Sequence, residues 1–369
     1  MQKICFLVIC LLIAGNYFAS AQTVKVPFTM DRWDTEGSDV TKEQYMGKES
    51  ILIKSGFIYL KDVDFLDGII EVDISFSAQR NFPGIAFRLQ DRNNYENFYV
   101  RPHQSGNPDA TQYTPVFNGL GGWQLYYGEG YSNAFTYKFN TWHHIKIDVH
   151  GNTAEIYIDD MQKPLINVTE LKREWKAGKI GLYGGNTPVH FANLQYTPRQ
   201  SAKPAEPSVP PTGTDGLVTQ YQVSNVVGRD PFNEATVLTP GIKDQLTWTT
   251  CKTEPSGTLN LAKYGQLGEN KNVMVARITF ESSSDQVKAI RFGFSDYVLV
   301  YLNDQALYFG RDNFTSRDYR FLGTIGLFDM LFLHLKKGTN ELWFVVSEDF
   351  GGWGVKAKFD DMMGVELSR

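Results

Sequence analysis

The residues best placed to do chemistry fall in one stretch of the sequence, Gly68 to His103. Three runs in this stretch, GIIEVDISFS, GIAFRLQD and NFYVRPH, alternate apolar and polar residues. Such alternation predicts strands with one buried face. If the three strands are neighbours, one sheet face gathers the polar side chains of Glu71, Asp73, Arg88, Tyr99, Arg101 and His103. This dense polar face predicts a site for a polar ligand, and a sugar lying across the sheet is the ligand we expect.

The two arginines of this face have two interpretations. Arg88 and Arg101 each present a rigid fork of donors that matches a carboxylate. Either the fork forms a cross-strand ion pair with Glu71 or Asp73, or it binds vicinal hydroxyls or an acidic group of a sugar. His103 is a candidate base or a hydrogen-bonding residue at the rim. No second histidine lies nearby at the spacing of metal ligands, so the sequence predicts no metal site.

A segment rich in glycine, asparagine and aromatic residues follows His103. It reads QSGNPDATQYTPVFNGLGGWQLYYGEGYSNAF, and long loops on sandwich domains often carry function. We expect this loop to form a wall of the site, with Trp123 or Tyr126 as a stacking platform. Asn118 and Gln124 would supply amide contacts. The alternative is that the aromatic residues fill a secondary core beneath the loop.

The first 21 residues have the pattern of a secretory signal peptide. Lys3 is followed by an apolar run from Phe6 to Ile13 and then by Ala19-Ser20-Ala21, an A-x-A cleavage site. The sequence therefore predicts a secreted or periplasmic protein. No later run reaches the roughly 18 apolar residues that a spanning helix needs, so we expect no membrane insertion.

A proline-rich segment divides the rest of the chain. TPRQSAKPAEPSVPPTGT has five prolines and no apolar periodicity, which is typical of an extended linker. We assign residues 199–214 to the linker, 22–198 to an N-terminal unit and 215–369 to a C-terminal unit. Both units are strand-rich, so the predicted fold class is all-β, with two antiparallel β-sandwiches of the jelly-roll type. Few contacts are expected between the two units.

Composition limits the partners and the covalent links that we expect. The formal net charge is -5, with both signs mixed along the chain, which argues against nucleic acid as a partner. Cys251 is the only cysteine after residue 21, so no internal disulfide is expected. Aromatic residues make up 14% of the sequence, and exposed ones are candidates for stacking on sugar rings. The oligomeric state is left open.

The N-terminal unit resembles a known fold. A tryptophan opens the strand in TWHHIKIDVHGNTAEIYIDD, residues 141–160, a Gly-Asn turn follows, and GKIGLYGG stands at residues 178–185. Together they resemble the concanavalin A-like or laminin G-like jelly roll over residues 28–198. The segments PGIAFR and FYVRPHQ are similar to secreted bacterial proteins grouped with 3-keto-disaccharide hydrolase domains. The resemblance implies a jelly-roll scaffold with a carbohydrate-related function.

Glu71 and Asp73 are the candidate catalytic residues. Laminarinase-type glucanases of the same fold carry a strand motif E-x-D-x-E, in which the two glutamates act as nucleophile and acid across the sugar bond and the central aspartate tunes them. The resemblance implies these roles for Glu71 and Asp73, as the first glutamate and the aspartate. Here the third position is Ser75, so the second glutamate of that motif is missing. Asp91 or Glu96 could replace it from another strand. We therefore favour a structural or ligand-binding role for Glu71 and Asp73 over a hydrolytic one.

The C-terminal unit also resembles a known fold. AIRFGFSDYVLVYLNDQALYFG, residues 289–310, and KKGTNELWFVV, residues 336–346, resemble the galactose-binding-like β-sandwich that accompanies many glycosidases. The glycines around Trp353 allow a backbone bend that presents this side chain at a loop tip. Trp353 is therefore a candidate sugar contact, and a core position is the favoured alternative.

These observations favour a carbohydrate-binding protein of polysaccharide utilisation, with a polysaccharide or oligosaccharide as its partner. The alternative is a glycoside hydrolase or 3-keto-glycoside-cleaving enzyme whose site lies on the N-terminal jelly roll. A third interpretation makes both units structural adhesion modules. None of the three requires a cofactor, and each is compatible with a structural calcium ion.

Overall fold

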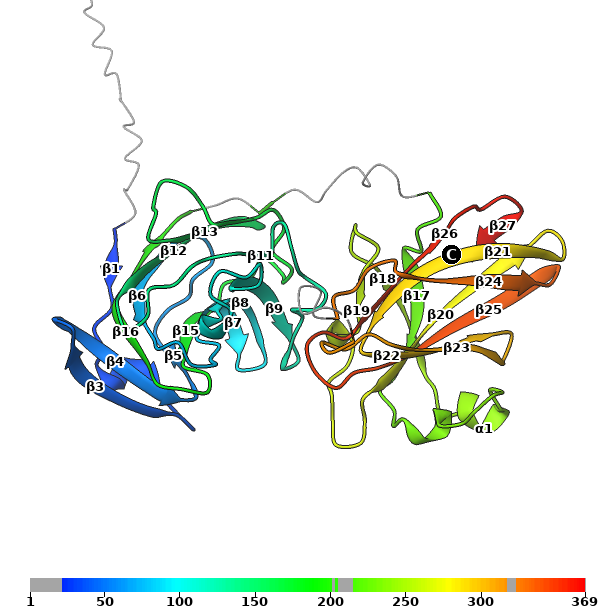
Figure 1. Cartoon of the computed structure of the whole chain (residues 1–369), viewed down its shortest axis with the longest axis horizontal. Coiled ribbons are helices and arrows are strands. Elements are labelled where there is room, and N and C mark those ends of the chain that lie inside the picture. The colour runs from blue at the N-terminus through cyan, green and yellow to red at the C-terminus, as the bar shows by residue number, and fades with distance from the viewer. Residues whose placement is uncertain (1–21, 201–202, 205–214, 317–322, 369) are drawn as a thin grey trace, which may run out of the picture.

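The computed structural model describes residues 22–200, 203–204, 215–316 and 323–368. The predicted signal peptide, residues 1–21, lies outside the described residues, as does most of the predicted linker. The described chain consists mainly of antiparallel strands, which form two β-sandwiches (Figure 1). The predicted all-β fold class is therefore confirmed. None of the helices in the described residues is long and apolar enough to cross a membrane.

The N-terminal sandwich packs two sheets face to face. The first sheet has, in spatial order, β14 (Ile166–Val168), β13 (Thr153–Ile158), β12 (His143–His150), β6 (Gly68–Ser75), β16 (Val189–Pro198), β4 (Lys48–Ser55) and β3 (Asp39–Tyr45), and β1 (Val24–Lys25) pairs with β16. The second sheet has β10 (Leu120–Gly121), β9 (Thr111–Phe117), β8 (Asn94–Val100), β7 (Gly84–Asp91), β15 (Lys179–Tyr183), β5 (Phe57–Leu60) and β2 (Trp33–Asp34), and β11 (Ser132–Asn133) pairs with β9.

The three strands between Gly68 and His103 do not lie in one sheet. β6 lies within the first sheet, between β12 and β16, whereas β7 and β8 are neighbours in the second sheet. The prediction of a single three-stranded face is therefore wrong for β6. The apolar face of β6 is as predicted, because Ile70, Val72 and Ile74 pack in the core cluster, but alternation does not specify which strands pair.

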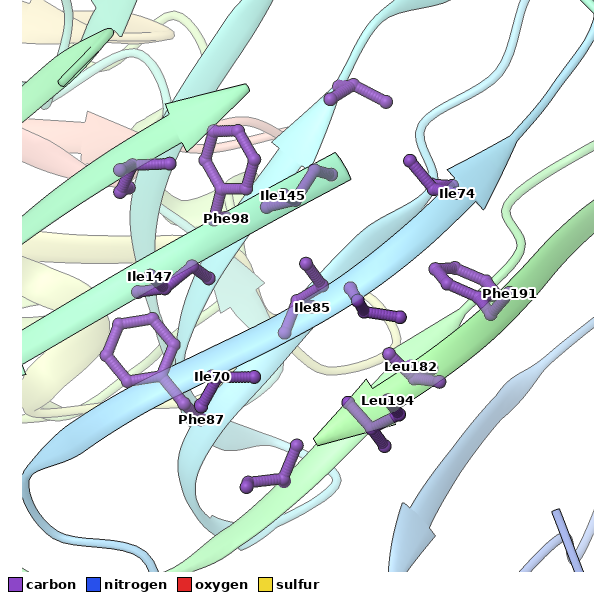
Figure 2. Packing of buried hydrophobic residues seen from close by; sticks show 14 of the residues in the cluster. Ile70, Ile74, Ile85, Phe87, Phe98, Ile145, Ile147, Leu182, Phe191 and Leu194 are labelled. Atoms are coloured by element: carbon purple, nitrogen blue, oxygen red, sulfur yellow. The ribbon is translucent and has the colours of Figure 1, made fainter. Parts of the chain in front are cut away.

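The inner faces of the two sheets form the N-terminal core. Ile70 and Ile74 of β6 and Ile147 of β12 pack in one cluster with Phe87 of β7 and Phe98 of β8 (Figure 2). Full burial of such side chains contributes about 1.5 to 3 kcal/mol each. This apolar core holds the sandwich without a disulfide, since the one cysteine among the described residues is a free, buried thiol.

The C-terminal sandwich is built from two further sheets. One has β18 (Trp248–Lys252), β17 (Gln220–Ser224), β20 (Val273–Ser282), β25 (Gly338–Ser347), β22 (Tyr297–Leu302) and β23 (Gln305–Arg311), and β27 (Val365–Leu367) pairs with β20. The other has β19 (Leu259–Asn260), β26 (Gly354–Phe359), β21 (Gln286–Ser295) and β24 (Asp329–Leu335). Helical segments among the described residues are single turns: the α-helix α1 (Pro240–Lys243) and the 3-10 helices Met30–Arg32, Pro102–Gln104, Asp230–Phe232 and Leu261–Lys263.

Trp353 belongs to the core of the C-terminal sandwich. Its side chain is fully buried, and its Nε1–H donates to the carbonyl oxygen of Val346 (3.1 Å). The indole is therefore not displayed at a loop tip, and the interpretation of Trp353 as an exposed sugar contact is wrong. A large aromatic ring with one polar atom is stable in a core when that atom finds an acceptor, as it does here.

The two sandwiches contact each other through both polar and apolar side chains. The Lys172 ammonium lies 3.0 Å from the Glu254 carboxylate across the interface, and both side chains are buried. The backbone N–H of Gln124 donates to the carbonyl oxygen of Gly351 (2.9 Å). Phe117 of the N-terminal sandwich packs into the C-terminal core. The expectation of few contacts between the two units is therefore wrong.

Candidate ligand-binding site

A cavity of about 620 Å³ opens where the second sheet of the N-terminal sandwich meets the C-terminal sandwich. Its volume lies within the usual range of ligand sites, about 300 to 1,000 Å³. β8 and β9 form its floor, the turn after β8 closes one end, and Phe314 and Phe350 of the C-terminal sandwich line it from the other side. The site is therefore shared between the two sandwiches.

The alternation of β8 determines which side chains reach the cavity. Tyr95, Asn97 and Tyr99 line the cavity. Phe98, between the last two, lies in the core between the sheets. The 3-10 helix Pro102–Gln104 then turns the chain, and Arg101 and His103 also line the cavity. The structure therefore brings together Tyr99, Arg101 and His103, in the phase opposite to Phe98 that the sequence predicts.

A hydrogen-bond network fixes the Arg101 guanidinium against the floor. Its Nη1 donates to Asp109 Oδ2 (2.6 Å) and its Nη2 to the Tyr99 hydroxyl (2.9 Å). The Tyr99 hydroxyl donates in turn to Gln112 Oε1 (3.0 Å), and Gln112 Nε2 donates to the carbonyl oxygen of Trp123 (2.9 Å). The Nε–H of Arg101 is buried and has no partner among the described residues. The network thus holds the guanidinium in one orientation at the floor of the cavity.

His103 is a neutral imidazole at one end of the cavity. Burial lowers its pKa, and the positive charges of Arg80 and Arg101 lower it further, against a smaller opposing effect of Asp109. Its Nδ1 is buried without a partner in the described part of the chain. The ring meets Phe82 edge to face, with 5.1 Å between the ring centroids. His103 can therefore act as a hydrogen-bonding group or as a base near neutral pH.

Aromatic side chains from both sandwiches form the walls. The ring centroids of Trp123 and Phe350 lie 5.7 Å apart, and those of Phe350 and Phe314 lie 5.2 Å apart. The guanidinium carbon of Arg101 lies 5.2 Å from the Trp123 centroid. Phe314 and Phe350 are 40% and 47% exposed. Sequence reasoning missed these two residues, because no periodic signal links a loop of one sandwich to a cavity on the other.

Three predicted contacts, Asn118, Gln124 and Tyr126, lie at the interface and do not line the cavity. The Asn118 side-chain amide donates to a carbonyl oxygen of the C-terminal sandwich (2.8 Å), and that of Gln124 donates to Asp296 Oδ1 (3.1 Å). The Tyr126 hydroxyl is hydrogen-bonded to the Glu254 carboxylate. These side chains therefore join the two sandwiches, whereas Trp123, from the same loop, reaches the cavity.

Arg88 is turned away from the cavity. Its backbone φ is 48°, within an irregularity of the β7–β8 pairing, so the simple alternation of the strand is broken there. The guanidinium is buried, with Nη2 donating to Asp67 Oδ1 (2.7 Å) and Nε to the carbonyl oxygen of Leu66 (2.8 Å). Arg88 therefore forms a buried ion pair with Asp67 rather than with Glu71 or Asp73, and the structure does not place it with the other site residues.

Glu71 and Asp73 lie on the outer face of the first sheet, away from the cavity. Asp73 Oδ1 lies 2.7 Å from His144 Nδ1, and Asp73 Oδ2 accepts from the Lys48 ammonium (2.6 Å). Glu71 Oε2 accepts from Gln195 (2.8 Å). Burial raises the pKa of Asp73, but the hydrogen bonds from His144 and Lys48 outweigh it and hold this pKa below its ordinary value. The two carboxylates form a network of their own on the first sheet, and their predicted place beside the cavity residues is wrong.

The other candidate carboxylates are also engaged elsewhere. Glu96 is fully buried on the core side of β8, where it accepts from the Tyr113 hydroxyl (2.7 Å). Asp91 accepts from the Asn93 backbone N–H (2.7 Å) in the turn between β7 and β8. Among the described residues that line the cavity, Asp109 is the only acidic one. The cavity thus lacks the pair of carboxyl groups that glycoside hydrolysis ordinarily uses. No group of three or more His, Cys, Asp or Glu side chains in the described chain is arranged to hold a metal ion.

The fold and the cavity define an all-β protein of two sandwiches that share one cavity, here called the cleft. Residues 28–197 match the family described as the 3-keto-alpha-glucoside-1,2-lyase-like domain. This match confirms the resemblance of the N-terminal unit that the segments PGIAFR and FYVRPHQ indicate. A search among curated proteins finds none that is similar at a significant level.

Several solved structures are similar to about half of the chain. The carbohydrate-binding module CBM66 from Bacillus subtilis is 18% identical, with a TM-score of 0.36, and the match covers 45% of this chain and 96% of that module. A protein described as a native glycosidic hydrolase is 14% identical, with a TM-score of 0.37, and the match covers 49% of this chain and 98% of that one. The Bacillus licheniformis beta-glucanase is 12% identical, with a TM-score of 0.31, over 50% of this chain and 95% of the glucanase.

Proposed function

We propose that this protein is a secreted or periplasmic carbohydrate-binding protein of polysaccharide utilisation, and that it binds a saccharide in the cleft between its two sandwiches. The observation that carries the proposal is the Arg101 network, which fixes a cationic side chain at an aromatic-walled cavity. Sugar binding needs flat apolar surfaces for the ring faces and fixed polar groups for the hydroxyls. The cleft offers both, with Trp123 and Phe350 as the apolar surfaces.

The family match supports a saccharide as the ligand. The family that matches residues 28–197 is described by an activity on a 3-keto-alpha-glucoside, which is a sugar derivative. The interior of the cleft is also pre-organised, since Arg101 is held by Asp109 and Tyr99 before any ligand arrives. Pre-organisation lowers the entropic cost of binding, because the contacting groups are ordered in the free protein.

A second candidate function, cleavage of a 3-keto-glycoside, is favoured by His103. In a 1,2-elimination a base removes the proton on C2, which the neighbouring ketone acidifies. The C1–C2 double bond forms as the C1–O bond breaks, and the leaving alcohol takes a proton. A neutral imidazole on a residue that lines the cleft has the properties of such a base. This route uses neither Glu71 nor Asp73.

The two candidate functions are tested together with one panel. The protein without residues 1–21 is screened against oligosaccharides and 3-keto-glucosides, with binding measured by calorimetry and cleavage by released sugar. We expect binding without turnover, and Trp123→Ala should weaken binding by at least about tenfold. Trp142→Ala is the matched control, because Trp142 lies near Lys48 on the first sheet and does not line the cleft.

The outcomes separate the alternatives. Binding that is unaffected by Trp123→Ala would rule out the cleft as the site. Turnover by the wild type that is lost in His103→Gln, while binding is kept, would replace the binding function by the cleavage function. Turnover that is lost in Glu71→Gln but kept in His103→Gln would place the active site on the outer face of the first sheet.

A further inference from the structure

The cleft is positively charged although the protein as a whole is acidic. Its charged lining residues are Arg80, Arg101 and Asp109, whereas the chain carries a formal net charge of -5. Asp109 is paired with Arg101 at 2.6 Å. Arg80 has no carboxylate partner within the described part of the chain. One positive charge is therefore left without a counter-charge at the cleft.

The two arginines act on the same end of the cleft. Their guanidinium carbons lie 5.2 Å (Arg80) and 5.8 Å (Arg101) from the centroid of the Phe82 ring. The His103 ring meets the ring of the same Phe82 edge to face. Both positive charges act on His103, since each of them lowers its pKa. Asp109 is the one charged group that opposes them there. The potential around Phe82 is therefore positive.

From this arrangement we infer that the saccharide bound in the cleft carries an anionic group, a ring carboxylate or a sulfate ester, and that this group lies beside Arg80 at the Phe82 end of the cleft. The inference rests on the proposed saccharide-binding function and names the class of sugar. An anion there would neutralise the surplus charge of Arg80, which lines the cleft. A hydroxyl of a neutral sugar could accept a hydrogen bond from Arg80 but would leave its charge unmatched.

The test uses saccharides that differ only in charge. Uronate-containing oligosaccharides are compared with their carboxyl-reduced counterparts, and sulfated oligosaccharides with their desulfated counterparts, by calorimetry on the full protein. We expect the anionic member of one pair to bind about fivefold or more tightly; the preference is modest because the charge of Arg80 is exposed to solvent. Raising the salt concentration from 0.05 to about 0.5 M should reduce this preference, because exposed charges are screened.

A charge-removing variant localises the preference. Arg80→Gln should abolish the preference for the anionic member, because it weakens the binding of that member more than the binding of the neutral one. Arg291→Gln is the matched control, since Arg291 is also a partly exposed arginine but lies on β21 of the C-terminal sandwich, paired with Asp360. An anion that binds beside His103 should also raise the pKa of this imidazole, which NMR titration of the histidine protons can follow.

Each result decides between the inference and the proposed function. If the neutral members bind equally well or more tightly, the inference is overturned and the proposed function stands. If the anionic member is preferred but Arg80→Gln keeps the preference and the pKa of His103 does not move, the anion lies elsewhere and the inference is again overturned. If no saccharide of either kind binds in the cleft, the proposed function fails and the inference fails with it.

Discussion

Arg101 should have two separable effects, one on stability and one on binding. The side chains of Arg101 and Asp109 are 7% and 3% exposed, and their charged atoms lie 2.6 Å apart. Removing one member of a buried ion pair leaves an uncompensated buried charge, which costs about 3 to 5 kcal/mol. We therefore expect Arg101→Met to lower the free energy of unfolding by about 3 to 5 kcal/mol. Saccharide binding should be lost at the same time.

A double variant separates the two effects. Arg101→Met with Asp109→Leu leaves no unpaired charge, so most of the lost stability should return, as it does when buried pairs are replaced by apolar side chains. Binding should not return, because the guanidinium donors are still absent. Urea unfolding followed by fluorescence gives the free energies, provided that the slope with denaturant is unchanged. Calorimetry with the best saccharide of the panel gives the affinities.

Two results would refute this reasoning. A single variant that costs less than about 1 kcal/mol would behave like the loss of a surface ion pair, and the network could not then be a rigid part of the site. A double variant that binds as tightly as the wild type would remove Arg101 from the ligand contacts, and the proposed function would lose the observation that carries it.

Two further predictions concern the rest of the molecule. The hydrogen bond with Asp73 raises the pKa of His144, so Asp73→Asn should bring this pKa back toward about 6.5 in an NMR titration; an unchanged value would contradict the contact. Because the folded-state pKa of His144 is raised, the stability from this contact is present below pH 6.5 or so and is lost as the pH rises through the folded-state pKa. After cleavage at a protease site inserted in the linker, the two sandwiches should stay together on size-exclusion chromatography, whereas Lys172→Met should weaken their association by leaving Glu254 with less compensation. Separation of the cleaved wild type would show that the interface does not hold by itself.

The sequence predicts the faces of the strands better than their neighbours. Alternation places Phe98 in the core and Tyr99 on the opposite face, and both assignments agree with the structure. The same rule fails for β6, since the chain passes from the first sheet to the second between β6 and β7, and nothing in a period of two reports such a change. It fails again at Arg88, where a left-handed backbone conformation breaks the alternation. Pairing and local backbone irregularities depend on the tertiary structure, so they could not be predicted from alternation.

The aromatic wall of the cleft is a consequence of the contact between the sandwiches. The backbone N–H of Gln124 donates to the carbonyl oxygen of Gly351 (2.9 Å), and the residues directly before these two are Trp123 and Phe350. One hydrogen bond between backbones thus brings the two rings to 5.7 Å from each other. The Gln124 side chain adds a further link through Asp296 (3.1 Å). The polar loop residue predicted to touch the ligand therefore serves the site indirectly, because it positions the tryptophan beside it, and a saccharide held between the two rings would in turn stabilise the contact between the sandwiches.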